Sequence, residues 1–304
     1  MTAFRLHHTF LLPGGYVDEQ GVLQREVELA PLTGREEELL AEPQASASPA
    51  LVTALLSHCV RRLGVLSPVP ASIIRRLLIA DRQYLLLKLR EATVGEQVQA
   101  TVQCPWAECG KKVDIDFSLA DIPVQESQDK GPLYTLELSP EAAVRSESGE
   151  LYREIIFRLP CGEDQEQLAP LLDQNEAGTL ALLLGRCIRR IGPVSDPGPE
   201  LIHRLPPLAR LEIERQMETV SPQVNLTLDT NCPECGREFV LPFDLAEFVF
   251  TELQTSCEAL YREVHCLAYH YHWSEHEIMS LPRTKRRHYI TLLAEEMERL
   301  SHAS

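Results

Sequence analysis

Two cysteine pairs in matching surroundings place the strongest constraint on how this chain folds. Cys104 and Cys109 lie in VQATVQCPWAECGKKVDIDFSL, and Cys232 and Cys235 lie in VNLTLDTNCPECGREFVLPFDL. In both stretches an alternating strand leads into a turn that starts with Cys-Pro and ends with Cys-Gly, and a second strand follows. Each stretch therefore predicts a β-hairpin that carries two thiols in its turn.

Four thiols are the ligand set of a closed structural zinc site. The two pairs are too far apart in the chain for a contiguous zinc ribbon, so we expect the two hairpins to meet and share one tetrahedral Zn²⁺. Four thiolates leave no open position for a substrate, which indicates a structural role. Two alternatives stay open, namely a pair that holds no metal and a redox pair. A redox CxxC normally begins a helix, whereas strands flank both of these pairs.

The N-terminal region predicts a β-hairpin followed by a short helix. Alternating apolar residues indicate strands at 4–12 and 22–30, separated by turn residues. Thr33 and Glu36 have the spacing of a capping box, in which each side chain satisfies the backbone donor of the other residue. A helix is therefore expected over 34–42.

The remainder of the chain is expected to be mostly helical, which makes the fold class α+β. Ser48 followed by Pro49 is a typical helix start, and the helix is expected to run to about Leu63. Ser274 with Glu277 forms a second capping box. Further helices are expected at 71–90, 164–173, 177–191, 207–219 and 283–300.

These elements divide the chain into six expected segments. They are an N-terminal β-hairpin with a short helix (1–45), a helical segment (46–95), the first zinc-knuckle hairpin (96–125), a helical middle domain (126–220), the second zinc-knuckle hairpin (221–245) and a C-terminal helical segment (246–304).

Composition argues against nucleic acid and membranes as partners. The chain has 29 Lys and Arg against 45 Asp and Glu, for a net charge of −16. Binding a phosphate backbone requires many cations, yet near the cysteines the sequence offers Lys111, Lys112 and Arg237. A zinc-ribbon nucleic-acid binder is thus the weaker alternative. The chain has no run of about 20 apolar residues that could span a bilayer and no secretion signal at its start, so a cytoplasmic protein is expected.

The sequence offers no recognisable active site. The motifs of serine hydrolases, dinucleotide-binding enzymes, P-loop NTPases and HExxH metalloproteases are missing. Cys161 could serve as a nucleophile, but the end of a strand is the simpler interpretation. A metalloenzyme would need a ligand set with an open position. Four histidines could in principle supply ligands, although packing and surface roles are expected for them: His265, His270, His272 and His276.

The last predicted helix has an unusual order of charges. Its first half carries Arg283, Lys285, Arg286 and Arg287. Its second half carries Glu295, Glu296 and Glu298. This order opposes the helix dipole, which favours anions at the start and cations at the end. We expect the four cations to bind a partner, the alternative being a solvated surface.

Several stretches together resemble the baseplate hub assembly chaperones of contractile-tail, T-even-type phages and related injection machines. They are GYVDEQGVLQREVELAPLTGREEELL, RRLLIADRQYLLLKLREATVGEQVQATVQCPWAECGKKVDIDF, REIIFRLPCGEDQEQLA and LYREVHCLAYHYHWSEHEIMSLPRTKRRHYITLL. The last of these is similar to short tail-associated proteins of contractile injection systems.

The resemblance implies a non-enzymatic protein that acts by protein–protein contact. It would assist assembly of the baseplate hub of a contractile tail or phage-like injection system, or remain in the finished particle as a minor component. The implied partners are baseplate hub or spike proteins.

Overall fold

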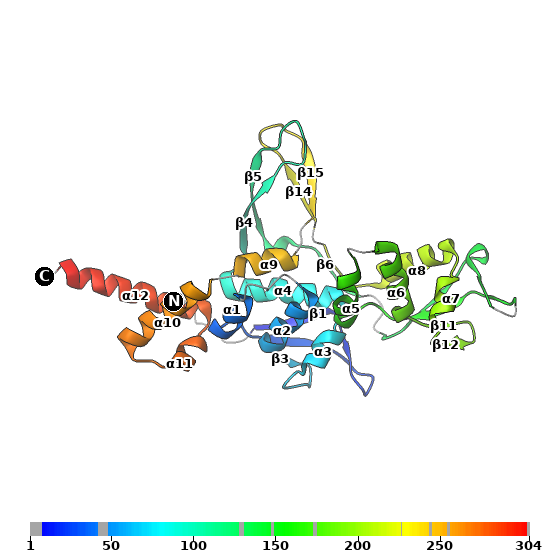
Figure 1. Ribbon diagram of the computed structural model, residues 1–304, viewed down its shortest axis with the longest axis horizontal. Coiled ribbons are helices and arrows are strands. Elements are labelled where there is room, and N and C mark those ends of the chain that lie inside the picture. Colours follow the sequence, from blue (N-terminus) through cyan, green and yellow to red (C-terminus); the bar gives the residue numbers. More distant parts are fainter. Residues whose placement is uncertain are drawn as a thin grey trace.

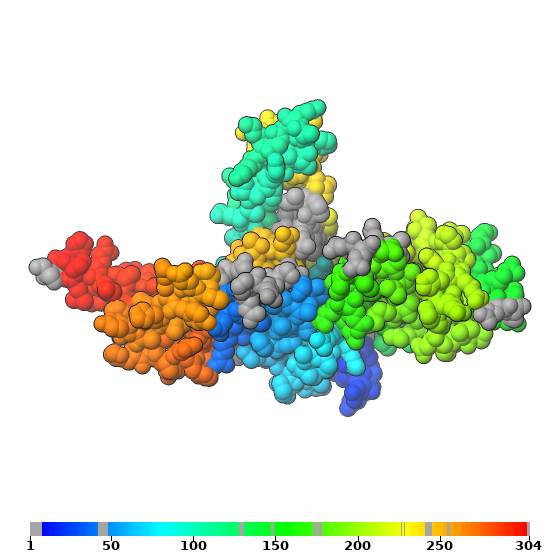
Figure 2. Space-filling model, in the orientation of Figure 1, coloured from blue at the N-terminus to red at the C-terminus, as the bar shows by residue number. Residues whose placement is uncertain are grey.

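The computed structural model describes residues 8–41, 48–127, 131–146, 149–172, 175–225, 227–242, 245–253 and 256–302. Helices and strands are both well represented, in keeping with an α+β protein. A central body carries two long hairpins that stand out from it together, and the C-terminal helices extend from one end of the body (Figures 1 and 2).

The first part of the chain forms a three-stranded antiparallel sheet in the order β1-β2-β3, followed by two helices and the first hairpin. Its elements are β1 (His8–Val17), β2 (Leu23–Leu29), α1 (Gly34–Leu40), α2 (Pro49–Cys59), β3 (Val60–Leu63), α3 (Ala71–Arg76), α4 (Ile79–Val94), β4 (Gln97–Gln103) and β5 (Lys112–Ser118).

The second part repeats this order around a sheet of strand order β12-β11-β10-β7. Its elements are β7 (Tyr134–Glu137), β10 (Glu154–Phe157), α5 (Gly162–Leu172), α6 (Glu176–Cys187), β11 (Ile188–Ile191), β12 (Val194–Ser195), α7 (Pro199–His203), α8 (Pro207–Val220), β14 (Thr227–Asn231) and β15 (Glu238–Pro242).

The remaining elements are short ones between or within the two parts, and the C-terminal helices. The short ones are η1 (Leu119–Asp121), β6 (Val124–Gln125), η2 (Pro140–Ala142), β8 (Val144–Arg145), β9 (Leu151–Tyr152) and β13 (Gln223–Val224). The C-terminal helices are α9 (Leu245–Leu253), α10 (Cys257–Tyr271), α11 (Glu275–Met279) and α12 (Arg283–His302).

The two parts match in hydrogen bonding as well as in element order. The N–H of Ala30 donates to the carbonyl of Cys59, and Arg158 donates to Cys187 in the same way, both at 2.9 Å. Each sheet has an irregularity of register at the corresponding place.

The glycines that directly follow β3 and β11 also correspond between the two parts. The N–H of Gly64 donates to Glu26, and that of Gly192 donates to Glu154. Both glycines have left-handed φ angles, 55° and 54°. The chain is therefore duplicated over much more than its cysteine hairpins.

A buried arginine, Arg82, lies where the two parts meet. Its guanidinium donates to the carbonyl of Pro49 at 2.7 Å and to the hydroxyl of Thr53 at 2.8 Å. Thr53 in turn donates to Glu166 of α5. Gly162 fits here because a Cβ at this position would lie 2.4 Å from a guanidinium nitrogen of Arg82.

Two predicted helices end earlier than expected. α2 stops at Cys59 instead of about Leu63, and α6 stops at Cys187, so β11 occupies 188–191. In each case the next four residues are two arginines between two apolar residues, and both apolar side chains are buried in a sheet core. Backbone pairing with β2 and β10 therefore replaces the last helical turn.

The helix predicted at 71–90 is divided into α3 and α4. Leu77 and Leu78 are extended, with ψ angles of 142° and 153°. The carbonyl of Leu77 accepts the N–H of Gly162 at 3.1 Å, and Leu78 forms a β-bridge with Cys161. Contact with the second part of the chain thus interrupts this helix.

The strand predicted at 4–12 is longer than expected, because β1 continues to Val17; residues 4–7 lie outside the described residues. Pro13, Gly14 and Gly15, expected as a turn, lie within β1. The carboxylate of Asp81 accepts the N–H groups of Gly14 and Gly15 at 2.8 and 2.9 Å. This side chain therefore supplies acceptors that a regular ladder would otherwise provide.

Both predicted capping boxes are present in the structure. Helix α1 starts at the predicted capping box, and α11 starts at the second one. The segment 126–220, expected to be mainly helical, also contains the four-stranded sheet. Among the described residues, no helix is both long enough and apolar enough to cross a membrane.

A pH-dependent stability is expected from Asp81. Burial raises the pKa of Asp81 to about 6, despite the two backbone donors, which lower it. The folded state thus favours the protonated carboxyl of Asp81. This stabilisation is complete below the unfolded-state pKa near 3.9 and is lost as the pH rises through the folded-state pKa of about 6. Asp81→Asn cannot ionise at this position. The free energy of unfolding of the wild type, compared with that of Asp81→Asn at the same pH, should therefore be lower at about pH 7.5 than at about pH 4.5. Urea denaturation midpoints at both pH values measure this.

The matched control is Asp121→Asn, which alters an exposed carboxylate. Its difference from the wild type should be the same at both pH values. A pH-independent difference for Asp81→Asn would contradict the assignment.

Candidate metal centre

The four cysteines lie in the turns between β4 and β5 and between β14 and β15. These two hairpins project from the body side by side (Figure 1). Cys104 follows β4, and Cys232 follows β14. Because the hairpins occupy equivalent places in the duplicated chain, their turns can approach each other. The duplication thus gives a structural reason why cysteines so far apart in sequence are neighbours.

Backbone hydrogen bonds shape both turns in a similar way. The N–H of Cys104 donates to the carbonyl of Lys111 at 2.8 Å, and that of Cys232 donates to Arg237 at 3.0 Å. A glycine follows the second cysteine of each pair and has a left-handed φ angle, 55° at Gly110 and 71° at Gly236. Glycine is favoured in this conformation because it has no Cβ.

The sulfur positions fit one tetrahedral metal ion. All four Sγ atoms lie within 4.8 Å of one another. Across the hairpins, Cys104 Sγ lies 3.9 Å from Cys235 Sγ, and Cys109 Sγ lies 3.7 Å from Cys232 Sγ. Metal–sulfur bonds of about 2.3 Å in a tetrahedron would separate the sulfurs by roughly 3.8 Å. A disulfide would require about 2.05 Å.

The environment of the thiols is half closed. Cys104 and Cys232 are buried, Cys109 is half-buried and Cys235 is exposed. A small apolar cluster around Val113 and Phe239 lies beneath them. The buried cysteines and the apolar cluster therefore close one side of the site, and Cys235 leaves the other side open to solvent.

The pKa values of Cys104 and Cys232 shift in opposite directions. Burial raises the pKa of Cys104 to about 12. Backbone N–H groups, above all that of Cys235, lower the pKa of Cys232 to about 7. Neighbouring thiolates repel each other, so a cation is needed for all four to be ionised together.

A second contact connects the two turns beyond the sulfurs. The guanidinium of Arg237 lies over the ring of Trp106, 5.3 Å from its centroid. It also forms an ion pair with Glu108 at 2.8 Å. Both contacts join the first hairpin to the second and are exposed, so we expect each to contribute little energy.

The other proposed ligands and nucleophile do not form a site in the described part of the chain. There, the four cysteines make up the one group of three or more His, Cys, Asp or Glu side chains close enough to hold a metal. His276 contacts Arg35 instead. The thiol of Cys161 is buried and donates to Asp164 at 3.3 Å, and burial raises its pKa, which opposes a nucleophilic role.

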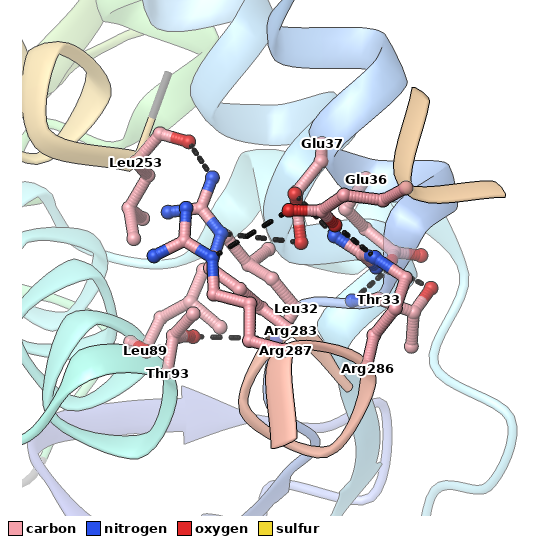
Figure 3. Close-up of polar contacts among 11 residues, drawn as sticks. Leu32, Thr33, Glu36, Glu37, Leu89, Thr93, Leu253, Arg283, Arg286 and Arg287 are labelled. Carbon is pink, nitrogen blue, oxygen red and sulfur yellow. Dashed lines mark hydrogen bonds and ion pairs between the residues drawn. The ribbon is translucent and has the colours of Figure 1, made fainter. Parts of the chain in front are cut away.

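Two of the four cations predicted to bind a partner are buried within the chain (Figure 3). Arg286 contacts Glu37 of α1 at 2.7 Å and Glu263 of α10 at 2.6 Å. Arg283 lies 3.2 Å from Glu37 and donates to the carbonyl of Leu253. These arginines join the C-terminal helices to the body, so the expectation that they bind a partner is wrong for these two residues.

The other two cations are more accessible. Arg287 is exposed, with its Nε 3.8 Å from Glu263. Lys285 is half-buried and borders a small pocket with Trp273 and Tyr289. A partner-binding role for these two remains a prediction.

Sequence reasoning missed Glu37, the carboxylate that receives both arginines. Its side chain is 1% exposed, although it follows Glu36 in a helix of surface-like composition. Gly34, one helical turn before Glu37, is the sequence feature that could have indicated this burial. A Cβ there would lie 2.7 Å from the sulfur of Met279, so the C-terminal helices approach α1 closely at this point.

Two family models match the chain. One, described as T4 bacteriophage base plate protein, matches residues 16–250. The other, described as a family of unknown function (DUF6760), matches residues 252–304. No curated protein matches the chain. No solved structure matches it either.

The four-cysteine site predicts stoichiometric metal binding. The chain purified under reducing conditions should contain about one metal ion per molecule by elemental mass spectrometry. Cys104→Ser should abolish this metal because it removes a buried ligand. Cys266→Ser, a cysteine outside the cluster, should retain it. Equal metal content in both variants would contradict the site.

The buried ion pairs predict a large loss of stability on removing Glu37. Glu37→Gln leaves the buried Arg283 without its carboxylate and Arg286 with Glu263 alone, which should cost about 3–5 kcal/mol. The neighbouring Glu38 is half-buried, and its contact with Tyr261 is exposed to solvent. Glu38→Gln should therefore cost about 1 kcal/mol or less. Thermal unfolding of both variants tests this, and equal effects would argue against a buried cluster.

Proposed function

The chain belongs to the T4 bacteriophage base plate protein family, and from this membership we propose that it serves the baseplate hub of a contractile phage tail or phage-like injection system. It acts there as a non-enzymatic assembly factor or as a minor component, by protein–protein contact with hub or spike proteins. The observation that carries the proposal is the family match over residues 16–250, which covers most of both duplicated parts and all four cysteines.

The metal in this proposal is Zn²⁺, bound by Cys104, Cys109, Cys232 and Cys235 together. Zinc favours tetrahedral thiolate sites, and a closed site contributes folding free energy. When bound, the ion supplies a cross-link between the two halves of the duplicated chain. The hairpins would then present one rigid projecting surface instead of two independent arms.

The charges near the cysteines support a protein partner more than a nucleic acid. Arg237 is already paired with Glu108. The outward face of β5 carries Asp114 and Asp116, both exposed. A phosphate backbone would meet these carboxylates, whereas a protein surface could complement them.

Fractionation of cells that assemble the particles tests the proposal. Assembled particles and soluble extract are separated, and this chain is quantified in each by mass spectrometry with the proteins that copurify with it. Recovery with hub proteins in the soluble pool indicates an assembly factor. Recovery in particles at fixed stoichiometry indicates a baseplate component. Recovery with neither would contradict the proposal.

A further inference from the structure

A motif of nine residues occurs three times in the chain, each time where a short helix is followed by a longer one. The motif has isoleucine at its first position, leucine at its fourth and arginine at its ninth. Its three copies are Ile74–Arg82, Ile202–Arg210 and Ile278–Arg286. They connect α3 to α4, α7 to α8 and α11 to α12. We call these copies the first, second and third docking elements.

The backbone follows the same path in the three docking elements. The N–H of the leucine donates to the carbonyl of the isoleucine, at 3.4 Å in the first element, 3.2 Å in the second and 3.0 Å in the third. The N–H of the arginine donates to the carbonyl of the fifth residue, at 3.1, 3.1 and 3.0 Å. The isoleucine is buried in every copy. The repetition of the two parts therefore extends to the C-terminal helices.

The first docking element is seated on the turn that opens α5. Leu78 forms an antiparallel β-bridge with Cys161. The carbonyl of Leu77 accepts the N–H of Gly162 at 3.1 Å. A Cβ on Gly162 would lie 2.4 Å from a guanidinium nitrogen of Arg82. The arginine of the element thus packs directly on the glycine of the turn.

The third docking element is seated in the same way on the turn that opens α1 (Figure 3). Pro282 forms an antiparallel β-bridge with Thr33. A Cβ on Gly34 would lie 3.2 Å from a guanidinium nitrogen of Arg286. We call the turns at Gly34 and Gly162 the receiving turns.

The two receiving turns share one chemistry. Each has a threonine or cysteine directly before the glycine, and a carboxylate two residues after the glycine accepts the N–H of that threonine or cysteine, at 2.8 and 2.9 Å. Further carboxylates pair with the docking element. Glu37 lies 2.7 Å from Arg286 of the third element. Glu166 lies 3.0 Å from Arg75 of the first. A receiving turn is thus an acidic helix start that a glycine opens.

The second docking element has no receiving turn within the described part of the chain. There, Pro206 forms no β-bridge of the kind that Leu78 and Pro282 form. Arg210 is half-buried, whereas the arginines of the two seated elements are 2% and 0% exposed. Pro207 is exposed, although the residue at the same position of the third element, Arg283, is buried. The conformation of a seated element is therefore present without its seat.

The position of the second element indicates what it would bind. The third element joins the C-terminal helices to the first part of the chain, and the first element joins the first part to the second. These three bodies follow one another in a row, with α7 and α8 at the end opposite to α12 (Figure 1). A receiving turn on another molecule would continue the row by the contact that already joins its members.

A second copy of the chain is a poor source of that turn. The turn at Gly34 is occupied by the third element of the same chain, and the turn at Gly162 by the first. Self-association would require one of these buried contacts to open. A different protein with an unoccupied receiving turn has no such cost.

We propose that the second docking element, Ile202–Arg210, binds a partner protein through a receiving turn. The partner would present a helix opened by a glycine that follows threonine or cysteine, with carboxylates in its first turn. This inference goes beyond the proposed function, because it concerns a surface to which that function assigns no role and holds whether or not the partner is a baseplate protein.

A peptide copy of a receiving turn tests the proposal on the full-length chain. The probe is a fluorescent synthetic peptide with residues 27–41 of this chain, VELAPLTGREEELLA, and binding is followed by fluorescence anisotropy. One comparison peptide carries Gly34→Leu, and the other is scrambled. Leucine favours the helix more than glycine does but blocks the close approach of the arginine. The probe should bind, and both comparison peptides should bind at least about tenfold more weakly.

Two pairs of variants locate the contact on α8. Arg210→Glu should weaken binding at least about tenfold, whereas Arg215→Glu, an exposed position outside the docking element, should change it less than about twofold. Pro207→Glu keeps the test independent of the half-buried arginine, since it adds a carboxylate at an exposed helix start, where the dipole favours one. It should also weaken binding at least about tenfold, because it would meet the carboxylates of the receiving turn. Leu211→Glu, likewise exposed, is its matched control.

Four results would overturn the proposal. The probe could fail to bind the wild type, the Gly34→Leu peptide could bind as well as the probe, or the variants within the docking element could bind as well as their controls. Sedimentation could instead reveal self-association of the wild type that Pro207→Glu abolishes, which would make a second copy the occupant. None of these results bears on the fractionation experiment, so the two proposals fail separately.

Discussion

The position of the four thiols depends on the contact between the two repeated units of the chain. Cys104 and Cys232 can be neighbours because each ends the first strand of a hairpin that occupies the same place in one of two repeated units. The contact between the units, centred on the buried Arg82 and the close approach of Gly162, sets the two hairpins on one side of the body. A stable junction far from the cysteines thus determines the geometry at the cysteines.

A second anchor, Glu37, holds the C-terminal helices in a comparable way. Two buried arginines of α12 converge on this one carboxylate, so the start of that helix is fixed to the body. The outer half of α12 has no comparable anchor on the described body and is solvated. The two anchors together give a molecule with a central body and two projections, one that carries the thiols and one formed by the outer half of α12. This division suits a protein that contacts others through its projections.

Local features of the fold could be predicted from the sequence, whereas features that depend on distant partners could not. The capping boxes at Thr33 and Ser274 and the cysteine turns are short patterns whose chemistry is complete within a few residues. The break at Leu77 depends on Gly162, and the burial of Arg286 depends on Glu37. Periodicity within one segment does not reveal such partners. The matching CVRRLG and CIRRIG stretches were a signal of the wider duplication and of the early helix ends.

The central claim is that one metal ion with four sulfur ligands joins the two halves of the chain. X-ray absorption spectroscopy at the zinc edge, on the full-length protein purified with its metal, tests this most directly. The account predicts four sulfur neighbours at about 2.3 Å and no nitrogen or oxygen in the first coordination shell. A shell with two sulfurs and lighter ligands would mean that each hairpin binds metal separately, and would contradict the shared site.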